Sequence, residues 1–558
     1  MALIEVSHLK YRYPGTDALV LDDLSFSIEK GAFIGIVGAN GAGKSTLSQA
    51  FLGLVPQFYK GAYGGTVLLN GMNTAKTPIA ELIKKVGLVF QNPFHQLSGA
   101  ADTVYNEVAY GLQNLGIPRE EIKTRIQETL ERFDMWQFRE KNPFDLSGGQ
   151  MQRVAIASIL AMKPEILILD EPTSQLDPAG TEEVFATVDA LTSSGITIIM
   201  IEQKMEKLAK YCDRLLLMAH GRLIDYDTPE KIFSREDLRD FGLEPPFSVS
   251  FAQSCGLKNP DGTYPTTPEA LEAVAERCAD FAKTLETNAT NPFTLKKTAE
   301  RYISEHAPAE IAAGETVFAI DDLHFSYDAG VEVLHGLTLP LDHRPTAIIG
   351  QNGAGKTTLV RLLKGLLKPD SGTVLYKGMN LGEKTVASLA SEIGYVFQNP
   401  DDQIFKYNVL DEVMFGPLNI GMSKEDAKKA ALEALRFVGL EQTASVNPYD
   451  LELHERKLVA IASVLAMNTG VIILDEPTIA QDAAGKKVLA KIVRSLAEEG
   501  RLVIAILHDM EFVSECFSRV IVMSHGSIVK DDTPDHVFRD AQAMQKAALT
   551  PPAVYSLI

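Results

Sequence analysis

The sequence predicts an α/β protein that contains the same domain twice. Each copy is expected to be a mostly parallel β-sheet flanked by helices, with an inserted helical subdomain. Three observations predict this fold class: short apolar runs alternate with helical patterns, a helix-like stretch interrupts the alternation, and the chain repeats itself. Alternating strand and helix units favour parallel strands covered by helices.

The strands of the first copy are predicted from five short apolar runs. These are AFIGIV (32–37), VGLVF (86–90), EILILD (165–170), ITIIMI (196–201) and RLLLMA (214–219). Runs of this length and composition are typical of strands buried on both faces of a sheet. The stretch from about 102 to 144 has a helical pattern instead, and it predicts the inserted helical subdomain.

The duplication is visible in gap-free matches between distant segments. LSGGQMQRVAIASILAMKPEILILDEPT (146–173) aligns with LELHERKLVAIASVLAMNTGVIILDEPT (451–478). A period this long indicates a duplicated domain rather than a solenoid. We predict a first domain over 1–228 and a second over 317–558. Residues 229–316, partly helical near 268–286, are either a linker or a C-terminal extension of the first domain.

Composition limits the classes of partner. The 558 residues carry a formal net charge of −20, which argues against nucleic acid as a partner. The N-terminus lacks a signal-peptide layout, and no apolar run is long enough for a membrane helix. The four cysteines show no metal-binding spacing. We therefore expect a cytoplasmic protein that reaches a membrane only through partner subunits.

Two glycine-rich segments carry the strongest chemical signal. Residues 38–45 and 350–357 both fit GxxxxGK[ST], and each follows an apolar run and precedes a helical pattern. This motif, the P-loop, holds nucleotide phosphates through converging backbone N–H groups and a lysine, while its Ser or Thr binds Mg²⁺. The predicted ATP-binding residues are Gly38, Asn40, Gly41, Gly43, Lys44, Ser45 and Thr46, and Gly350, Asn352, Gly353, Gly355, Lys356, Thr357 and Thr358.

An acidic pair ends one strand in each copy. ILILDE and VIILDE deliver Asp170–Glu171 and Asp475–Glu476 to the edge of the sheet where the P-loop also lies. Asp170 and Asp475 are then the metal carboxylates, as in the Walker-B motif. Glu171 and Glu476 are placed to act as general bases on the attacking water.

LSGGQ at 146–150 resembles the signature of ABC ATPases, and this resemblance covers both copies and most of the chain. It implies signature contacts from Ser147, Gly148, Gly149 and Gln150. It also implies that Tyr13 and Tyr327 stack on adenine, although local packing of a strand-edge tyrosine is the alternative. It further implies that Gln91 and Gln398 touch Mg²⁺ and the attacking water, that Asp177 and Asp482 form the D-loops, and that His508 contacts the γ-phosphate.

The second copy departs from the signature, and the first departs at the switch position. LELHE places Glu452, Leu453 and His454 where the signature has Ser and two Gly, and Gln203 stands where the family has His. Domains of this family pair head to tail, so that the P-loop of one copy meets the signature of the other. Both departures then fall in one composite site. We predict that this site mainly binds ATP and that the site with Glu476, His508 and LSGGQ hydrolyses it, with neutral drift as the alternative.

The segment FQNPDDQIF (397–405), followed by VLDEVMFGPLNIGM, resembles the ATPase of energy-coupling factor (ECF) importers of vitamins or transition metals. That resemblance implies two partners, a transmembrane coupling subunit and a substrate-binding membrane subunit, on the inner face of the cell membrane. Alternatives are the fused ATPase of a sugar importer and a ribosome-associated tandem ABC translation factor. The latter is disfavoured because acidic residues outnumber basic ones between 228 and 310.

Overall fold

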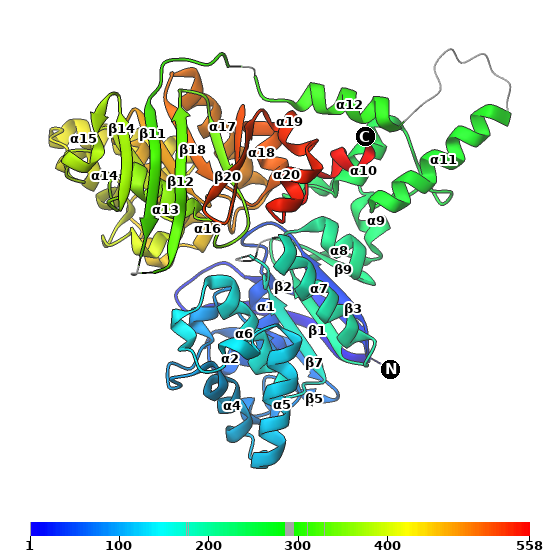
Figure 1. Cartoon of the computed structure of the whole chain (residues 1–558). Coiled ribbons are helices and arrows are strands. Elements are labelled where there is room, and N and C mark those ends of the chain that lie inside the picture. The colour runs from blue at the N-terminus through cyan, green and yellow to red at the C-terminus, as the bar shows by residue number, and fades with distance from the viewer. Residues whose placement is uncertain (1, 175, 177, 285–294, 310, 328–329) are drawn as a thin grey trace. The chain divides into compact units, whose positions relative to one another are not determined.

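The computed structural model describes residues 2–174, 176, 178–284, 295–309, 311–327 and 330–558. The chain divides into two units, residues 1–292 and 293–558, whose strands follow one another in the same order (Figure 1). Each unit contains a mostly parallel sheet with helices, so the predicted fold class is confirmed. Across the described residues, no helix is both long and apolar enough to cross a bilayer.

The central sheet of the first unit has six strands in the order β10-β9-β3-β8-β7-β6. Each of the five predicted apolar runs contains one of its strands. Only β10 runs antiparallel to its neighbour. The strands are β3 (Phe33–Val37), β6 (Val86–Val89), β7 (Ile166–Asp170), β8 (Thr197–Ile201), β9 (Arg214–Ala219) and β10 (Arg222–Asp227).

A second, antiparallel sheet of four strands was not predicted from the sequence. Its order is β2-β1-β4-β5, with β1 (Ala2–Arg12), β2 (Leu21–Glu29), β4 (Ala62–Leu69) and β5 (Met72–Asn73). Its inward residues, among them Ile4 and Leu9, share a core cluster with Ile34 and Phe51. Strand β3 therefore faces this sheet and helix α1 (Lys44–Phe51) with one side, since alternate residues of a strand point to opposite faces.

The predicted helical subdomain is present and covers the other face. It comprises α4 (Val104–Asn114) and α5 (Arg119–Arg132), which pack against α6 (Gly148–Ala161). Thr103 begins α4 by accepting the N–H of Asn106, as a polar N-cap does. The buried side chains of these helices join Phe33 and Val37 of β3 in one cluster.

The second unit repeats this arrangement. Its central sheet has the order β16-β17-β18-β13-β19-β20 and its antiparallel sheet the order β12-β11-β14-β15. The central strands are β13 (Thr346–Ile349), β16 (Ile393–Val396), β17 (Val471–Asp475), β18 (Leu502–Ile506), β19 (Arg519–Ser524) and β20 (Ser527–Asp532). The others are β11 (Phe318–Ser326), β12 (Glu332–Leu341), β14 (Ser371–Tyr376) and β15 (Met379–Asn380). Helices α13 (Lys356–Leu363), α14 (Val409–Asn419), α15 (Lys424–Val438) and α16 (Leu453–Leu465) correspond to α1, α4, α5 and α6.

Further helices complete each unit. In the first these are α2 (Leu54–Gln57), α3 (Ile79–Leu82), α7 (Pro178–Thr192) and α8 (Met205–Tyr211). In the second these are α17 (Ala483–Glu498), α18 (Met510–Cys516), α19 (Pro534–Phe538) and α20 (Ala541–Lys546). The chain ends on the short 3₁₀ helix η9 (Ala553–Leu557).

The segment between the two copies is divided between the units. Helices α9 (Pro229–Phe233), α10 (Phe247–Cys255) and α11 (Pro268–Thr284) belong to the first unit, and Phe233 and Val249 are buried in its core cluster. Helix α12 (Leu295–His306) belongs to the second unit and contacts η9. LEPP leads into α10 and LTPP leads into η9, so the two proline-containing sequences occupy equivalent places before a short helix.

Candidate active sites

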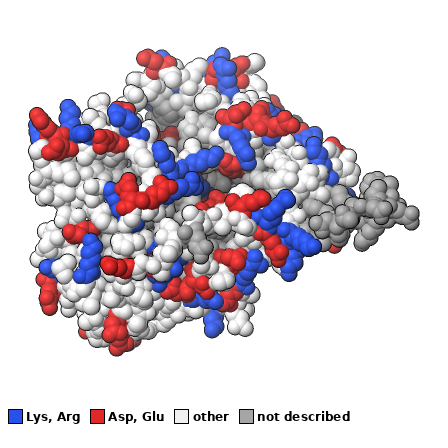
Figure 2. Space-filling view, turned by 90° about the horizontal axis from the view of Figure 1, so that it is seen from above, with Lys and Arg blue, Asp and Glu red and all other residues white. Residues whose placement is uncertain are grey.

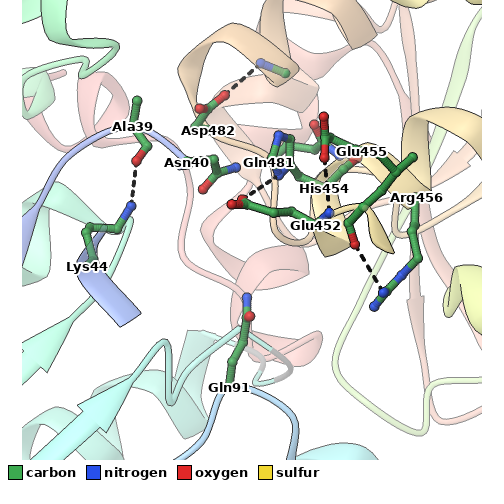
Figure 3. A network of polar contacts seen from close by, with 12 residues as sticks. Ala39, Asn40, Lys44, Gln91, Glu452, His454, Glu455, Arg456, Gln481 and Asp482 are labelled. Carbon is green, nitrogen blue, oxygen red and sulfur yellow. Dashed lines mark hydrogen bonds and ion pairs between the residues drawn. The ribbon is translucent and has the colours of Figure 1, made fainter. Parts of the chain in front are cut away.

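The first P-loop connects β3 to α1 and folds tightly around its lysine. The ammonium group of Lys44 is buried and donates to the carbonyl oxygen of Gly38 at 2.7 Å. It also donates to the carbonyl oxygen of Ala39 at 2.8 Å (Figure 3). Gly43 caps α1 with φ 95°. A Cβ added at Gly38 would stand 2.3 Å from the carbonyl oxygen of Met218, so only glycine fits there.

The second P-loop has the same construction between β13 and α13. Lys356 donates to the carbonyl oxygens of Gly350 at 2.7 Å and Gln351 at 2.9 Å. A Cβ at Gly350 would stand 2.2 Å from the carbonyl oxygen of Met523. Both loops therefore present a glycine-rich backbone, a buried ammonium group and a helix N-terminus, the arrangement that binds phosphate.

A tyrosine lies beside each P-loop helix. The hydroxyl of Tyr13 is 3.2 Å from Thr46 Oγ1, and that of Tyr327 is 3.2 Å from Thr358 Oγ1. Tyr13 also donates to Gln49, and the ring of Tyr327 is 53% exposed. The structure thus brings each predicted aromatic residue next to its P-loop, while stacking on adenine stays a prediction.

In the first copy, the acidic pair ends β7 beside the P-loop. Glu171 adopts φ 46° and is buried, and its carboxylate accepts from Gln91 Nε2 at 2.6 Å and from Gln203 Nε2 at 2.8 Å. Gln203 also donates to Asn40 of the P-loop at 3.3 Å. Burial and the neighbouring Glu171 raise the pKa of Asp170 to about 7, against a hydrogen bond from Ser45.

In the second copy, the pair ends β17. The buried Glu476 has φ 49°, accepts from Gln398 Nε2 at 2.9 Å, and its Oε1 lies 3.2 Å from Nε2 of His508. Burial alone would raise the pKa of Glu476, but His508, Lys356 and Lys457 hold it below its usual range. Glu476 is therefore ionised at neutral pH and able to accept a proton.

The same residue types fit a magnesium ion. Mg²⁺ takes oxygen ligands, usually one or two carboxylates together with phosphate and water. Each copy offers such a set: Ser45, Gln91 and Asp170 in the first, Thr357, Gln398 and Asp475 in the second. Asp475 Oδ1 is buried and without a hydrogen-bond partner among the described residues, so a ligand position is free there. Burial and Glu476 raise the pKa of Asp475 to about 6.

The two signature sequences begin equivalent helices, each with a capping box that is formed by different residues. Ser147 starts α6 with a capping box, in which the Gln150 N–H donates to Ser147 Oγ at 3.3 Å and the Ser147 N–H to Gln150 Oε1 at 3.1 Å. Gly148 and Gly149 form the first turn of the helix.

At the start of α16, the carboxylates of Glu452 and Glu455 and the imidazole of His454 stand at the positions of Ser147, Gln150 and Gly149. The N–H of Glu452 donates to the carboxylate of Glu455 at 3.0 Å, and His454 Nδ1 lies 3.4 Å from Glu452 Oε2 (Figure 3). Burial would lower the pKa of His454, but Glu452, Glu455 and Asp482 raise it. The positive end of this helix thus carries its own negative charge.

Of the two predicted D-loop residues, the structure describes only Asp482, in the second copy. Asp482 caps α17 by accepting the N–H of Gly485 at 2.9 Å, and the preceding Gln481 donates to the carbonyl oxygen of His454 at 3.0 Å (Figure 3). The predicted D-loop and the segment LELHE of the second copy are therefore linked by a hydrogen bond. Asp177 lies outside the described residues.

Two contacts around the second acidic pair were missed by the sequence reasoning. The hydroxyl of Tyr395 donates to Asp475 Oδ2 at 2.8 Å, and the buried ammonium group of Lys457 donates to the carbonyl oxygen of Glu476 at 2.5 Å. The aligned residues of the first copy are Leu88 and Gln152. This difference between the copies is the sequence signal that could have drawn attention to both residues.

Comparison with known proteins places the chain in a family. The ABC transporter family matches residues 21–174 and 336–479. A putative ABC transporter ATP-binding protein of Methanosarcina acetivorans is 37% identical over 553 residues, which is 98% of this chain and 89% of the relative. One of Caldanaerobacter subterraneus is 35% identical over 559 residues, covering 99% of this chain and 95% of the relative.

Among solved structures, cbiO1 from Clostridium perfringens, described as part of the ABC transporter complex cbiONQ, is 32% identical. The match covers 44% of this chain and 99% of that chain, with a TM-score of 0.39. The family match and the full-length relatives agree with the two P-loops and with LSGGQ. The chain therefore belongs to the ABC transporter family, as an ATP-binding protein with two ATPase domains in tandem.

Proposed function

We propose that this protein is the ATP-hydrolysing subunit of an ECF-type importer for a vitamin or a transition metal. It would lie on the inner face of the cell membrane, held there by a transmembrane coupling subunit and a substrate-binding membrane subunit. The resemblance of 397–405 and the residues after it to ECF ATPases supports this reading, as do relatives named as ABC transporter ATP-binding proteins.

An exposed aromatic surface after Gln398 is the observation that carries the importer proposal. Phe405 is 52% exposed, its ring centroid lies 4.7 Å from that of Phe415, and Lys406 lies over both rings. Tyr449 is half exposed and donates to the backbone of Ile404 at 2.7 Å. Exposed apolar patches of this kind mark protein interfaces.

The first unit has a corresponding surface. Phe94, three residues after Gln91, stacks on Phe144 with ring centroids 6.3 Å apart, and both rings are exposed. Such surfaces suit apolar coupling helices of a membrane partner. On the face shown in Figure 2, basic and acidic side chains are interspersed.

The hydrolytic role rests on Glu476. Its carboxylate, held between Gln398 and His508, would take a proton from the water that attacks the γ-phosphate, and Lys356 would bind the phosphates. Mg²⁺, when bound, would supply positive charge to the phosphate oxygens. Thr357, Gln398 and Asp475 would hold it in this copy, and Ser45, Gln91 and Asp170 in the other.

We further propose that the two domains pair within one chain, each P-loop facing the signature of the other copy. Fusion in one polypeptide favours this by effective concentration. The site that receives LELHE would meet carboxylates at Glu452 and Glu455, which repel phosphate oxygens. That site also has Gln203, a neutral amide, in place of an imidazole. It would hold ATP, while the site containing Glu476, His508 and LSGGQ turns it over.

Paired glutamine variants test this asymmetry. Glu476→Gln is expected to lower the steady-state ATPase rate by roughly 100-fold or more, since general-base catalysis contributes about 10²–10⁴-fold. Glu171→Gln is the matched variant of the other copy and should change the rate by about twofold at most. Equal losses in the two variants would contradict the asymmetric mechanism.

Co-purification tests the importer proposal. The full chain should recover membrane subunits from detergent extracts, and Phe405→Ser with Phe415→Ser should abolish that recovery without changing basal ATPase activity. Val386→Ser, at another exposed apolar residue of the same unit, is the control. Sedimentation with ribosomes in place of membrane subunits would contradict the proposal.

A further inference from the structure

The metal carboxylate of the second copy is held by a side chain that the first copy does not have. Tyr395 lies on β16, next to β17, and its hydroxyl donates to Asp475 Oδ2 at 2.8 Å in the buried interior. The other oxygen, Oδ1, has no hydrogen-bond partner among the described residues. Oδ2 is thus held by a hydrogen bond, and Oδ1 is left to bind a cation.

The difference between the copies lies at equivalent positions. Leu88 pairs with Ile168 in the first sheet, and Tyr395 pairs with Ile473 in the second, each two residues before the aspartate of the acidic pair. Leu88 is apolar and cannot donate, and Asp170 interacts instead with Ser45 of the P-loop. Ser45 is itself a predicted magnesium ligand, so within the described part of the chain the first aspartate has no separate donor of this kind.

The surroundings of Tyr395 hold its hydroxyl in place. Its ring makes an edge contact with Phe397 at 4.9 Å between centroids, and Phe397 directly precedes Gln398. Arg361 of α13 interacts with the hydroxyls of both Tyr395 and Tyr327. In the first copy, Gln49 stands in place of Arg361. The Tyr395 hydroxyl is the donor in this contact, because a carboxylate oxygen accepts.

A donor to one carboxylate oxygen fixes the plane of the group and the direction of the other oxygen. Hydrogen-bonded partners of this kind orient metal ligands, and their loss commonly costs about 10–100-fold in metal affinity or activity. A hydrogen bond to an ionised acceptor in a buried site is also stronger than one between neutral groups.

We propose that Tyr395 is a positioning residue that orients Asp475 toward a divalent cation, so that the second copy binds the cation of its MgATP more tightly than the first. This rests on the proposed role of Asp475 as a metal carboxylate. It is independent of which composite site hydrolyses ATP.

The test measures cation binding rather than turnover. Mn²⁺ binding to the full chain with a non-hydrolysable ATP analogue is followed by electron paramagnetic resonance, in an Asp170→Asn background that leaves the second metal carboxylate intact. Tyr395→Phe should weaken Mn²⁺ binding by roughly tenfold. Tyr376→Phe is the control, because it removes another buried tyrosine hydroxyl, 3.0 Å from Glu392, and should leave Mn²⁺ binding unchanged.

A reciprocal variant keeps the proposal open to refutation should Tyr395→Phe fold poorly. Leu88→Tyr, in an Asp475→Asn background, supplies the donor to the first copy and should tighten Mn²⁺ binding there. The proposal is overturned if Tyr395→Phe and Tyr376→Phe shift the Mn²⁺ dissociation constant equally, or if Leu88→Tyr leaves it unchanged. Equal ATPase losses in Glu476→Gln and Glu171→Gln would overturn the catalytic asymmetry alone.

Discussion

Lys457 places a buried ammonium group beside the acidic pair of the second copy, and replacing it by methionine should stabilise the second unit at neutral pH. Burial lowers the pKa of Lys457 from 10.5 to about 8 despite the attraction of Glu476 and Asp475. That difference corresponds to about 3 kcal/mol of destabilisation when the amine is charged. Methionine cannot donate to the Glu476 carbonyl oxygen, and the loss of this hydrogen bond costs about 1 kcal/mol of stability. The net gain is about 2 kcal/mol.

The lowered pKa of Lys457 also determines how the free energy of unfolding changes with pH. The unfolded chain keeps the lysine protonated up to about pH 10.5, whereas the folded chain loses the proton near pH 8. The unfolded state thus binds more protons between these values, and wild-type stability rises with pH there. Below pH 8 the full penalty applies, so Lys457→Met should be the more stable protein. Its advantage should shrink above pH 8 and reverse near pH 10.5.

Differential scanning calorimetry of the full chain measures this. At pH 7 the transition of the second unit should rise by roughly 4–8 °C. ATPase activity should fall about tenfold or more, because the backbone of Glu476 loses its support.

Lys364→Met is the control. That lysine is also buried, with a pKa lowered to about 8, and donates to the backbone of Ile393, away from Glu476. It should stabilise the unit without loss of activity. A lower transition temperature for Lys457→Met at pH 7, or a difference from wild type that does not vary with pH, would refute the reasoning.

Two further predictions concern charge at the ATP sites. Ser147→Glu puts the residue of the degenerate signature at the intact one. It should fold normally, because Glu452 begins the equivalent helix, but ATPase activity should fall roughly 100-fold. An ATPase rate of Ser147→Glu above half that of the wild type would contradict this prediction. MgATP binding should release protons below pH 7 and weaken toward pH 5, because the pKa values of Asp170 and Asp475 are raised to about 7 and 6. Calorimetry in buffers of different ionisation enthalpy measures this, and Asp170→Asn should reduce the release.

The elements that carry the P-loops could be predicted because their signals are local. Apolar runs mark β3 and β7, and the glycine and lysine spacing of 38–45 fixes a strand–loop–helix unit. The antiparallel sheet was not predicted because its strands are only partly buried and pair across long stretches of chain, as β1 does with β4. Buried and exposed residues partly alternate along β1 and β2, but this alternation does not show which strands pair in the fold.

The sequence by itself determined that this protein has two P-loops, two acidic pairs and one altered signature, because each is a short run of residues whose chemistry follows from its spacing. The tertiary structure alone decided what surrounds those groups. Tyr395 and Lys457 reach the second acidic pair only because β16, β17 and α16 pack together, whereas Leu88 and Gln152 occupy the same places in the first copy. Hydrogen bonds between residues distant in sequence are set by packing, which brings different residues to the same place in the two copies.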